Sequence, residues 1–154
     1  MPASPHIAPA LASLSFHHLG LAVASRDDAF RYLASLGYSP GNSVFDPLQR
    51  VNLAMHHHPT MPDIEVIWPG DGPSPVDKLI EKTGSMIYHI CYACPDADAA
   101  LGALSAAGNE VITLSPPTAA VLFDGQEVSF HHVSGFGLIE ILHTSLQPGR
   151  QQPE

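Results

Sequence analysis

The 154-residue sequence predicts an α+β fold in which two tandem βαβββ modules form a curled mixed sheet around a shared cleft. Three observations support this prediction. A strand-like segment around His18 resembles a segment around His89, at a shift of 71 residues. The same shift relates two segments that each have a capping residue, an apolar stripe at helical spacing and a terminating glycine. Each copy then closes with an apolar segment around one glutamate, Glu65 in the first and Glu140 in the second, at a shift of 75 residues.

A helix is expected after the opening strand of each module. Ser25 and Asp96 are suitable N-terminal caps, and Gly37 and Gly108 are suitable terminating residues. Between cap and glycine, apolar residues recur at helical spacing. They are Ala29, Phe30, Leu33 and Leu36 in the first helix and Ala100, Leu101, Leu104 and Ala107 in the second.

The remaining strands are bounded by turn residues. Segments 51–55 and 128–132 follow Gly-Asn-Ser and Asp-Gly-Gln turns, and a hairpin-like strand is expected over 120–123. A short helix over 75–82, capped by Ser74, is expected to join the modules. The predicted organisation is a flexible tail over 1–15, a first module over 16–69, a linker over 70–86, a second module over 87–144 and a flexible tail over 145–154.

Composition excludes several classes of protein. Fifteen acidic residues against six basic ones give a formal charge of -9 with neutral histidine. No cluster of Lys or Arg occurs, so a nucleic-acid partner is not expected. No apolar run approaches the ~20 residues of a membrane helix, and the N-terminal segment lacks a basic signal-peptide start. We therefore expect a cytoplasmic protein with no membrane association.

Four polar side chains are placed by strand alternation on the faces that the helices do not cover. His18 shares a strand face with Gly20 and Ala22, and His89 shares one with Cys91 and Ala93. Glu65 and Glu140 are each flanked by two core-type residues. Two imidazoles and two carboxylates suit a divalent metal such as Mn, Co, Ni, Fe or Zn. The alternative is that these are ordinary half-buried polar residues. Recurrence of both positions in both modules favours the metal site.

The other histidines and the two cysteines are weaker candidates. The run His56–His58 is followed by prolines, which favours an exposed loop, and His132 shares the strand face of Val128. Cys91 and Cys94 have C-x-x-C spacing, but residues i and i+3 of a strand face opposite sides. We therefore interpret their spacing as coincidence.

These residues resemble the vicinal oxygen chelate superfamily of glyoxalases and dioxygenases, and most of all its methylmalonyl-CoA epimerase-like members. The resemblance is carried by His-Leu-Gly-Leu-Ala-Val at 18–23, Ile-Glu-Val-Ile-Trp-Pro at 64–69 followed by Ser-Pro at 74–75, Tyr-His-Ile-Cys at 88–91 and Gly-Leu-Ile-Glu at 137–140. It implies a glyoxalase-like fold around a metal cleft, with His18, Glu65, His89 and Glu140 as ligands of one divalent ion (Co, Mn, Ni, Zn, Mg or Fe). It also implies a small-molecule substrate, with an acyl thioester as the candidate, and suggests a homodimer.

The reaction implied is proton removal next to a carbonyl by an isomerase or epimerase, with Glu140 as catalytic base. Some epimerases carry a second acid near the position of Leu53, so a replacement from His56–His58 or His132 is expected. Segment 116–123 also replaces their glycine-rich loop. The alternatives are a glyoxalase I-like lyase, an Fe(II)-dependent dioxygenase and a metal-free binding protein for a metabolite or drug. Glu65 as fourth ligand disfavours the dioxygenase, and the complete ligand set ranks the binding protein last.

Overall fold

The computed structural model describes residues 6–144. The elements are α1 (Pro9–Ala12), β1 (Ser15–Ala22), α2 (Arg26–Ser35), β2 (Ser39–Pro40), β3 (Val44–Asp46), β4 (Val51–His57), β5 (Ile64–Pro69), α3 (Pro75–Thr83), β6 (Met86–Cys94), α4 (Ala97–Ala106), β7 (Val111–Ala119), the 3-10 helix η1 (Val121–Phe123), β8 (Glu127–Val133) and β9 (Gly137–His143).

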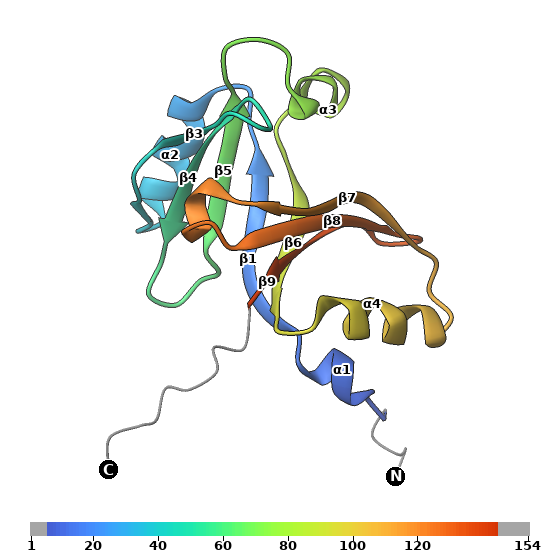
Figure 1. Ribbon diagram of the computed structural model, residues 1–154. Helices are drawn as coiled ribbons and strands as arrows, with labels where there is room; N and C mark the ends of the chain where they lie inside the picture. The colour runs from blue at the N-terminus through green and yellow to red at the C-terminus, as the bar shows by residue number, and fades with distance from the viewer. Residues whose placement is uncertain (1–5, 145–154) are drawn as a thin grey trace.

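One mixed sheet runs through both modules, which confirms the predicted fold class. Its strand order is β2-β4-β5-β1-β6-β9-β8-β7, and β3 pairs with β4 outside this path. The opening strand of each module pairs in parallel with the closing strand, β1 with β5 and β6 with β9. The two opening strands pair antiparallel at the centre of the sheet, where they join the modules (Figure 1).

The two module helices have equivalent bounds and caps, as the predicted duplication requires. Helices α2 and α4 begin and end at positions related by the same shift of 71 residues. The side chains of Ser25 and Asp96 each accept a hydrogen bond from the backbone N–H three residues later. Gly37 and Gly108 follow the helices with φ of 94° and 91°, a left-handed conformation that favours glycine. The linker helix α3 also begins as predicted, with a capping box between Ser74 and Asp77.

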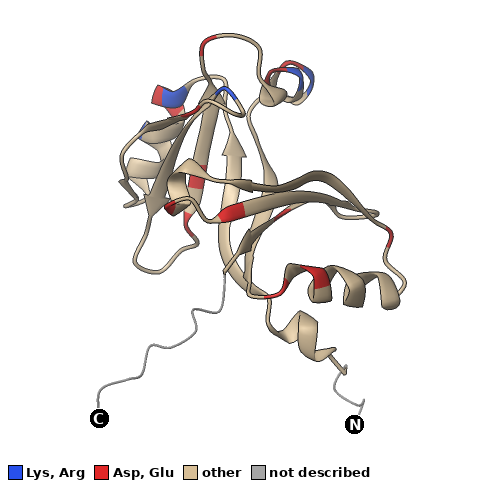
Figure 2. Cartoon of the chain, viewed as in Figure 1, with Lys and Arg blue, Asp and Glu red and all other residues tan. Residues whose placement is uncertain are grey.

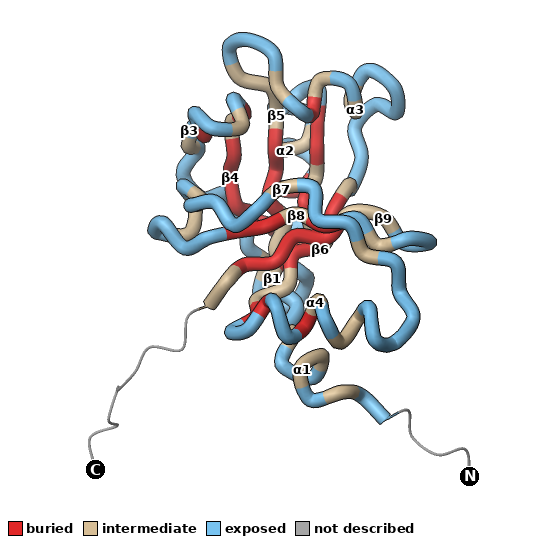
Figure 3. The backbone as a smooth tube through the Cα atoms, turned by 45° about the vertical axis from the view of Figure 1, so that its right-hand side comes forward, coloured by how far each residue is buried: buried red, intermediate tan, exposed pale blue. Residues whose placement is uncertain are grey.

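Each helix covers the outer face of its own module, and the inner faces of both modules form the cleft. Residues of β1 and β5 pack with α2 in a cluster built on Val23, Leu33, Tyr38 and Val66. Helix α4 packs on Cys94 and Ile141. The inner faces carry separate clusters, built on Val51, Leu53, Ile67 and Val76 in the first module and on Cys91, Val128 and Leu142 in the second. Buried residues accordingly follow the central strands (Figure 3).

Several elements differ from the prediction. Strands β2, β3 and β7 lie in segments for which no strand was predicted. Residues 121–123 form η1 instead of a strand, because Asp124 and Gly125, with φ of 51° and 78°, reverse the chain there. The expected N-terminal coil contains α1, because Leu11 and Leu14 cover the small side chains of α4. The tail expected over 145–154 lies outside the described residues. Within residues 6–144, every helix is too short or too polar to cross a membrane.

Candidate metal centre

Four adjacent strands at the centre of the sheet each contribute one of the predicted ligands. Glu65 lies on β5, His18 on β1, His89 on β6 and Glu140 on β9. Their exposed fractions are 4%, 0%, 2% and 3%, so all four side chains are inside the protein. The strand register repeats between the modules. Gly20 of β1 pairs with Glu65, and the equivalent residue of β6, Cys91, pairs with Glu140.

The two imidazoles converge on the Oε1 atom of Glu140, and Glu65 approaches the group only through His18. Glu140 Oε1 lies 3.3 Å from His18 Nε2 and 3.6 Å from His89 Nε2. Glu65 Oε2 lies 3.8 Å from His18 Nε2 on the other side. One ligand atom each from His18, His89 and Glu140 lies within 4.8 Å of the other two, which is compatible with binding to one ion.

Buried polar atoms without hydrogen-bond partners test whether these residues fit a metal ion. His18 Nε2, both ring nitrogens of His89 and Glu140 Oε1 are buried and make no hydrogen bond. Buried polar groups nearly always have a partner, since an unsatisfied one costs roughly 1–3 kcal/mol. Several such atoms at one point are satisfied together by a cation. The donor set therefore fits a divalent metal ion.

Neighbouring residues orient the two imidazoles. His17 Nδ1 lies 2.8 Å from His18 Nδ1, and this bond can hold the proton of His18 on Nδ1 and leave Nε2 free to bind a metal. A Cβ added at Gly20 would overlap the ring of His89, so glycine makes room for this ligand. Phe123 of η1 stacks on His18 with ring centroids 5.7 Å apart. The segment after β7 thus covers the site.

The two glutamates have opposite electrostatic environments. Burial, followed by the charges of Glu140 and Asp46, raises the pKa of Glu65 well above its usual range. Burial also acts to raise the pKa of Glu140, but the adjacent imidazoles of His18 and His89 outweigh it and lower that pKa to about 2. Glu140 is therefore ionised, and Glu65 binds a proton strongly when no cation replaces it.

The site opens into a larger cavity. A small inner cavity of about 20 Å³ lies against Glu65, Glu140 and Phe123. An outer cavity of about 510 Å³ adjoins it, with Tyr88 and Phe130 lining both. The outer walls come from α3, β7 and β8 and are mostly apolar. This volume is in the usual range for small-molecule sites.

The histidine run at 56–58 does not line either cavity. The His56 ring packs against Phe30 of α2, with centroids 4.5 Å apart, on the face away from the cleft. His57 Nδ1 lies 3.0 Å from a carboxylate oxygen of Asp63. His58 accepts two backbone N–H groups of the following loop, so its role is structural. None of the three is placed to replace a second acid.

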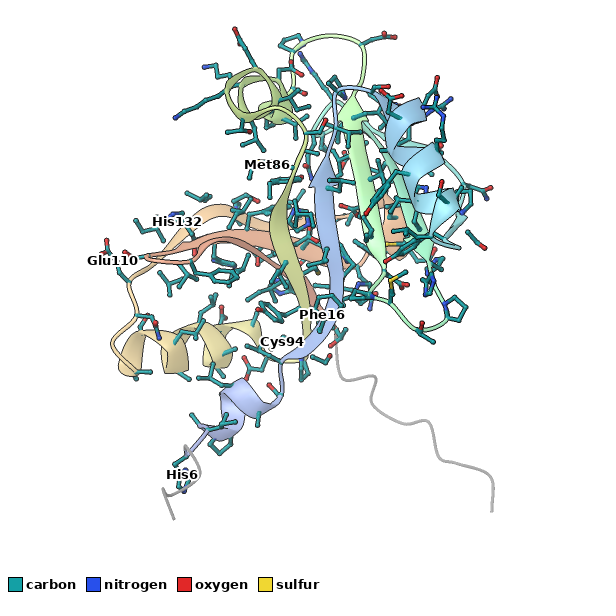
Figure 4. All side chains as sticks on the ribbon, turned by 180° about the vertical axis from the view of Figure 1, so that it is seen from behind. His6, Phe16, Met86, Cys94, Glu110 and His132 are labelled. Atoms are coloured by element: carbon teal, nitrogen blue, oxygen red, sulfur yellow. The ribbon has the colours of Figure 1, made fainter. Side chains whose placement is uncertain are left out.

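His132 does not line either cavity. It is exposed at the open end of the β7–β8 ladder, opposite Ile112 and near Glu110 (Figure 4). Leu53 does line the inner cavity, as expected, but it is apolar. The acid that sequence reasoning missed is Asp46, which ends β3 and lines both cavities. Its only signal in the sequence is its place before the Pro-Leu-Gln turn.

The two cysteines do not add to the site. Both are free and buried, and they pack in different clusters, Cys91 on the cleft side and Cys94 under α4. Cys91 lies close enough to His17 and His18 to complete a three-ligand set. However, burial raises the pKa of its thiol far above the usual range, which disfavours the thiolate that binds metals.

Fold and site together define a glyoxalase-like protein. The sequence model of the Glyoxalase/Bleomycin resistance protein/Dioxygenase superfamily matches residues 17–130. The chain therefore belongs to this superfamily, which confirms the resemblance found in the sequence. No curated protein matches the chain.

Solved structures with the same fold include methylmalonyl-CoA epimerases. The enzyme from Mycobacterium tuberculosis is 23% identical, with a TM-score of 0.71 over 92% of this chain and 94% of that one. The enzyme from Streptomyces coelicolor, in complex with 2-nitronate-propionyl-CoA, is 23% identical, with a TM-score of 0.67 over 88% and 100%. A hypothetical protein from Bacillus halodurans is 26% identical, with a TM-score of 0.72 over 89% and 99%.

Proposed function

We propose that the chain is a divalent-metal-dependent epimerase that removes and returns a proton next to the carbonyl of an acyl thioester. The observation that carries this proposal is the set of buried, partnerless ligand atoms, since Glu140 among them lines the inner cavity that adjoins a substrate-sized one. The similarity to methylmalonyl-CoA epimerases in complex with acyl-CoA compounds supports the choice of substrate class.

His18, Glu65, His89 and Glu140 would hold the metal ion. A divalent ion bound there lowers the energy of the negative charge that develops on a carbonyl oxygen when the adjacent carbon loses a proton. Glu140 then acts as the base, because it is ionised and lines the inner cavity. Phe123 and the rest of η1 cover the ligands and exclude bulk water from the reacting carbon.

The outer cavity suits the acyl part of a thioester. Its apolar walls can pack against an alkyl chain, and Ser115 and Thr118 of β7 offer hydroxyl groups. Pro75, Val76 and Leu79 of α3 form the wall on the linker side. Lys78 and Lys82 are exposed on the same helix, whereas residues 83–144 contain no Lys or Arg (Figure 2). Helix α3 is therefore the place where the phosphates of a CoA moiety would find cations.

Metal content is the first test of this proposal. Protein purified without added metal should contain about one divalent ion per chain, and Glu65→Gln should reduce this content. Glu127→Gln, which alters an exposed glutamate of β8, is the matched control. A chain that binds no divalent ion would overturn the proposal.

Exchange at the α-carbon is the second test. Metal-loaded protein in D₂O should introduce deuterium into 2-methylmalonyl-CoA and interconvert its epimers, as followed by NMR and chiral analysis. Glu140→Gln should reduce the rate by at least about 100-fold, the usual contribution of a positioned acid or base. A metal-loaded chain that exchanges no α-proton in this or related 2-substituted acyl-CoA compounds is not an epimerase of this class.

A further inference from the structure

Asp46 occupies the junction between the two cavities. It lines the inner cavity together with Glu65 and Glu140, and it also lines the outer cavity. Its exposed fraction is 3%, and it reaches this place because β3 folds back on β4, with Asp46 opposite Val51. An acidic residue of the first module therefore lines the same small cavity as Glu140 of the second module.

The local structure does not require a negative charge at Asp46. Its Oδ1 accepts hydrogen bonds from the backbone N–H groups of Leu48 and Gln49, at 2.8 Å and 3.2 Å. Asparagine makes the same turn without a charge. No ion pair with Asp46 occurs among residues 6–144, and its charge is close enough to Glu65 to oppose ionisation of that residue. A buried, uncompensated carboxylate is costly, which points to a functional reason for it.

Inversion of a carbon centre needs proton transfer at both faces of that carbon. The group that removes the proton from one face cannot return it to the other face unless the substrate turns over. Glu140 and Asp46 come from opposite modules and border one cavity, so a carbon held between them is accessible to both. Asp46 also borders the larger cavity, through which its carboxyl group can exchange protons with water.

We propose that Asp46 is the second acid–base residue of the epimerisation, acting on the face of the α-carbon opposite Glu140. The inference rests on the proposed function. In one direction, the C–H bond breaks, its proton goes to the Glu140 carboxylate, and its electron pair is delocalised into the carbonyl. The O–H bond of protonated Asp46 then breaks and its proton forms the new C–H bond on the other face. The roles are exchanged in the reverse direction, and nothing is oxidised or reduced.

The test compares Asp46→Asn with the unchanged chain, each loaded with metal, on the separate epimers of 2-methylmalonyl-CoA in D₂O. Asparagine keeps the acceptor for the turn, so the variant should still fold cooperatively and still bind the metal ion. Epimerisation should fall by at least about 100-fold. One epimer should still exchange its α-proton through Glu140, with retention of configuration. Asp46→Ser, which also keeps a turn acceptor, should behave in the same way.

Asp71→Asn, at an exposed aspartate after β5, is the matched control and should leave epimerisation unchanged. Equal epimerisation by Asp46→Asn and the unchanged chain would overturn the role of Asp46. Loss of metal binding in both Asp46 variants would also overturn it, because that result assigns the residue to the metal site. If the unchanged chain binds metal but exchanges no α-proton, the proposed function fails, independently of Asp46.

Discussion

Space for the His89 imidazole depends on the absence of a side chain at Gly20, directly across the β1–β6 ladder. Gly20→Ala should push the ring away from Glu140 and reduce metal affinity by about 10-fold or more, with a loss of roughly 1–3 kcal/mol in stability from overpacking. Metal titration and urea unfolding measure the two effects. Gly102→Ala is the control, because Gly102 lies in α4 with open space beside it. An unchanged metal affinity in Gly20→Ala would contradict the ligand role of His89.

His17 is expected to act on the metal through His18. His17→Phe keeps an aromatic ring, and with it the edge contact to Phe123, but removes the nitrogen that bonds His18 Nδ1. Metal affinity should fall about 10–100-fold, while unfolding in the absence of metal changes little. Competition with a coloured chelator gives the affinity. If the variant binds metal as tightly as the unchanged chain, His18 does not need this bond to orient its Nε2 atom.

Single residues of the site differ in how far the sequence could predict them. Strand alternation was sufficient to place His18 and Glu65 on the cleft side, because Glu65 lies between two apolar residues and His18 begins an alternation of polar or small residues with Leu19 and Leu21. Asp46 could not be found in this way, since its closeness to Glu65 arises from the folding of β3 onto β4. His56 was misleading for a related reason: its ring faces α2, so a polar residue in a cleft-forming strand points to the opposite side.

At the scale of elements, the two module helices depend on equivalent caps. Ser25→Ala and Asp96→Ala should each cost about 1 kcal/mol, because each removes an acceptor for a free N–H group in the first helical turn. The caps lie in different modules, so the double variant should show the sum of the two losses. Urea unfolding followed by circular dichroism measures all three variants. A loss in the double variant far from this sum would mean that α2 and α4 are energetically coupled.

Helices were predicted more accurately than the covering segment because their signals are local. A cap, an apolar stripe and a glycine determine α2 within the chain segment itself. In contrast, Val121–Phe123 is a short apolar run, which alone does not distinguish a strand from a helical turn. Its conformation follows from tertiary packing: Leu122 packs with the inner cluster of the first module, and Phe123 lies on His18.

At the scale of the whole molecule, duplication explains why the site lies where it does. The β1–β6 pair joins two equivalent strands, so each module brings one histidine and one glutamate to the same point. Neither module contains the whole ligand set, and the inner cavity is lined by residues of both. Metal binding should therefore stabilise the assembled sheet and not one module alone.

The buried glutamates also make global stability depend on pH and metal. Because burial and neighbouring charges raise the pKa of Glu65 from 4.5, the folded metal-free chain keeps a proton that the unfolded chain loses above pH 4.5. The contribution of Glu65 to the free energy of unfolding is complete below pH 4.5 and is lost as pH rises through the folded-state pKa of this residue. Glu140 acts oppositely: its contribution is present above pH 4.5 and is lost as pH falls towards its pKa of about 2.

Comparison of the unchanged chain with Glu65→Gln isolates the pH dependence of stability that is due to Glu65. The free energy of unfolding of the unchanged chain, minus that of the variant, should fall by up to about 1.4 kcal/mol per pH unit above pH 4.5. Excess divalent ion should reverse this trend, because the ion replaces the proton and binds more tightly as pH rises. Urea unfolding from about pH 5 to about pH 8, with metal or with a chelator, measures the effects of the proton and of the metal ion on the free energy of unfolding. Glu127→Gln serves as the exposed control. Parallel pH profiles for the unchanged chain and Glu65→Gln in chelator would show that Glu65 is not the residue that holds this proton.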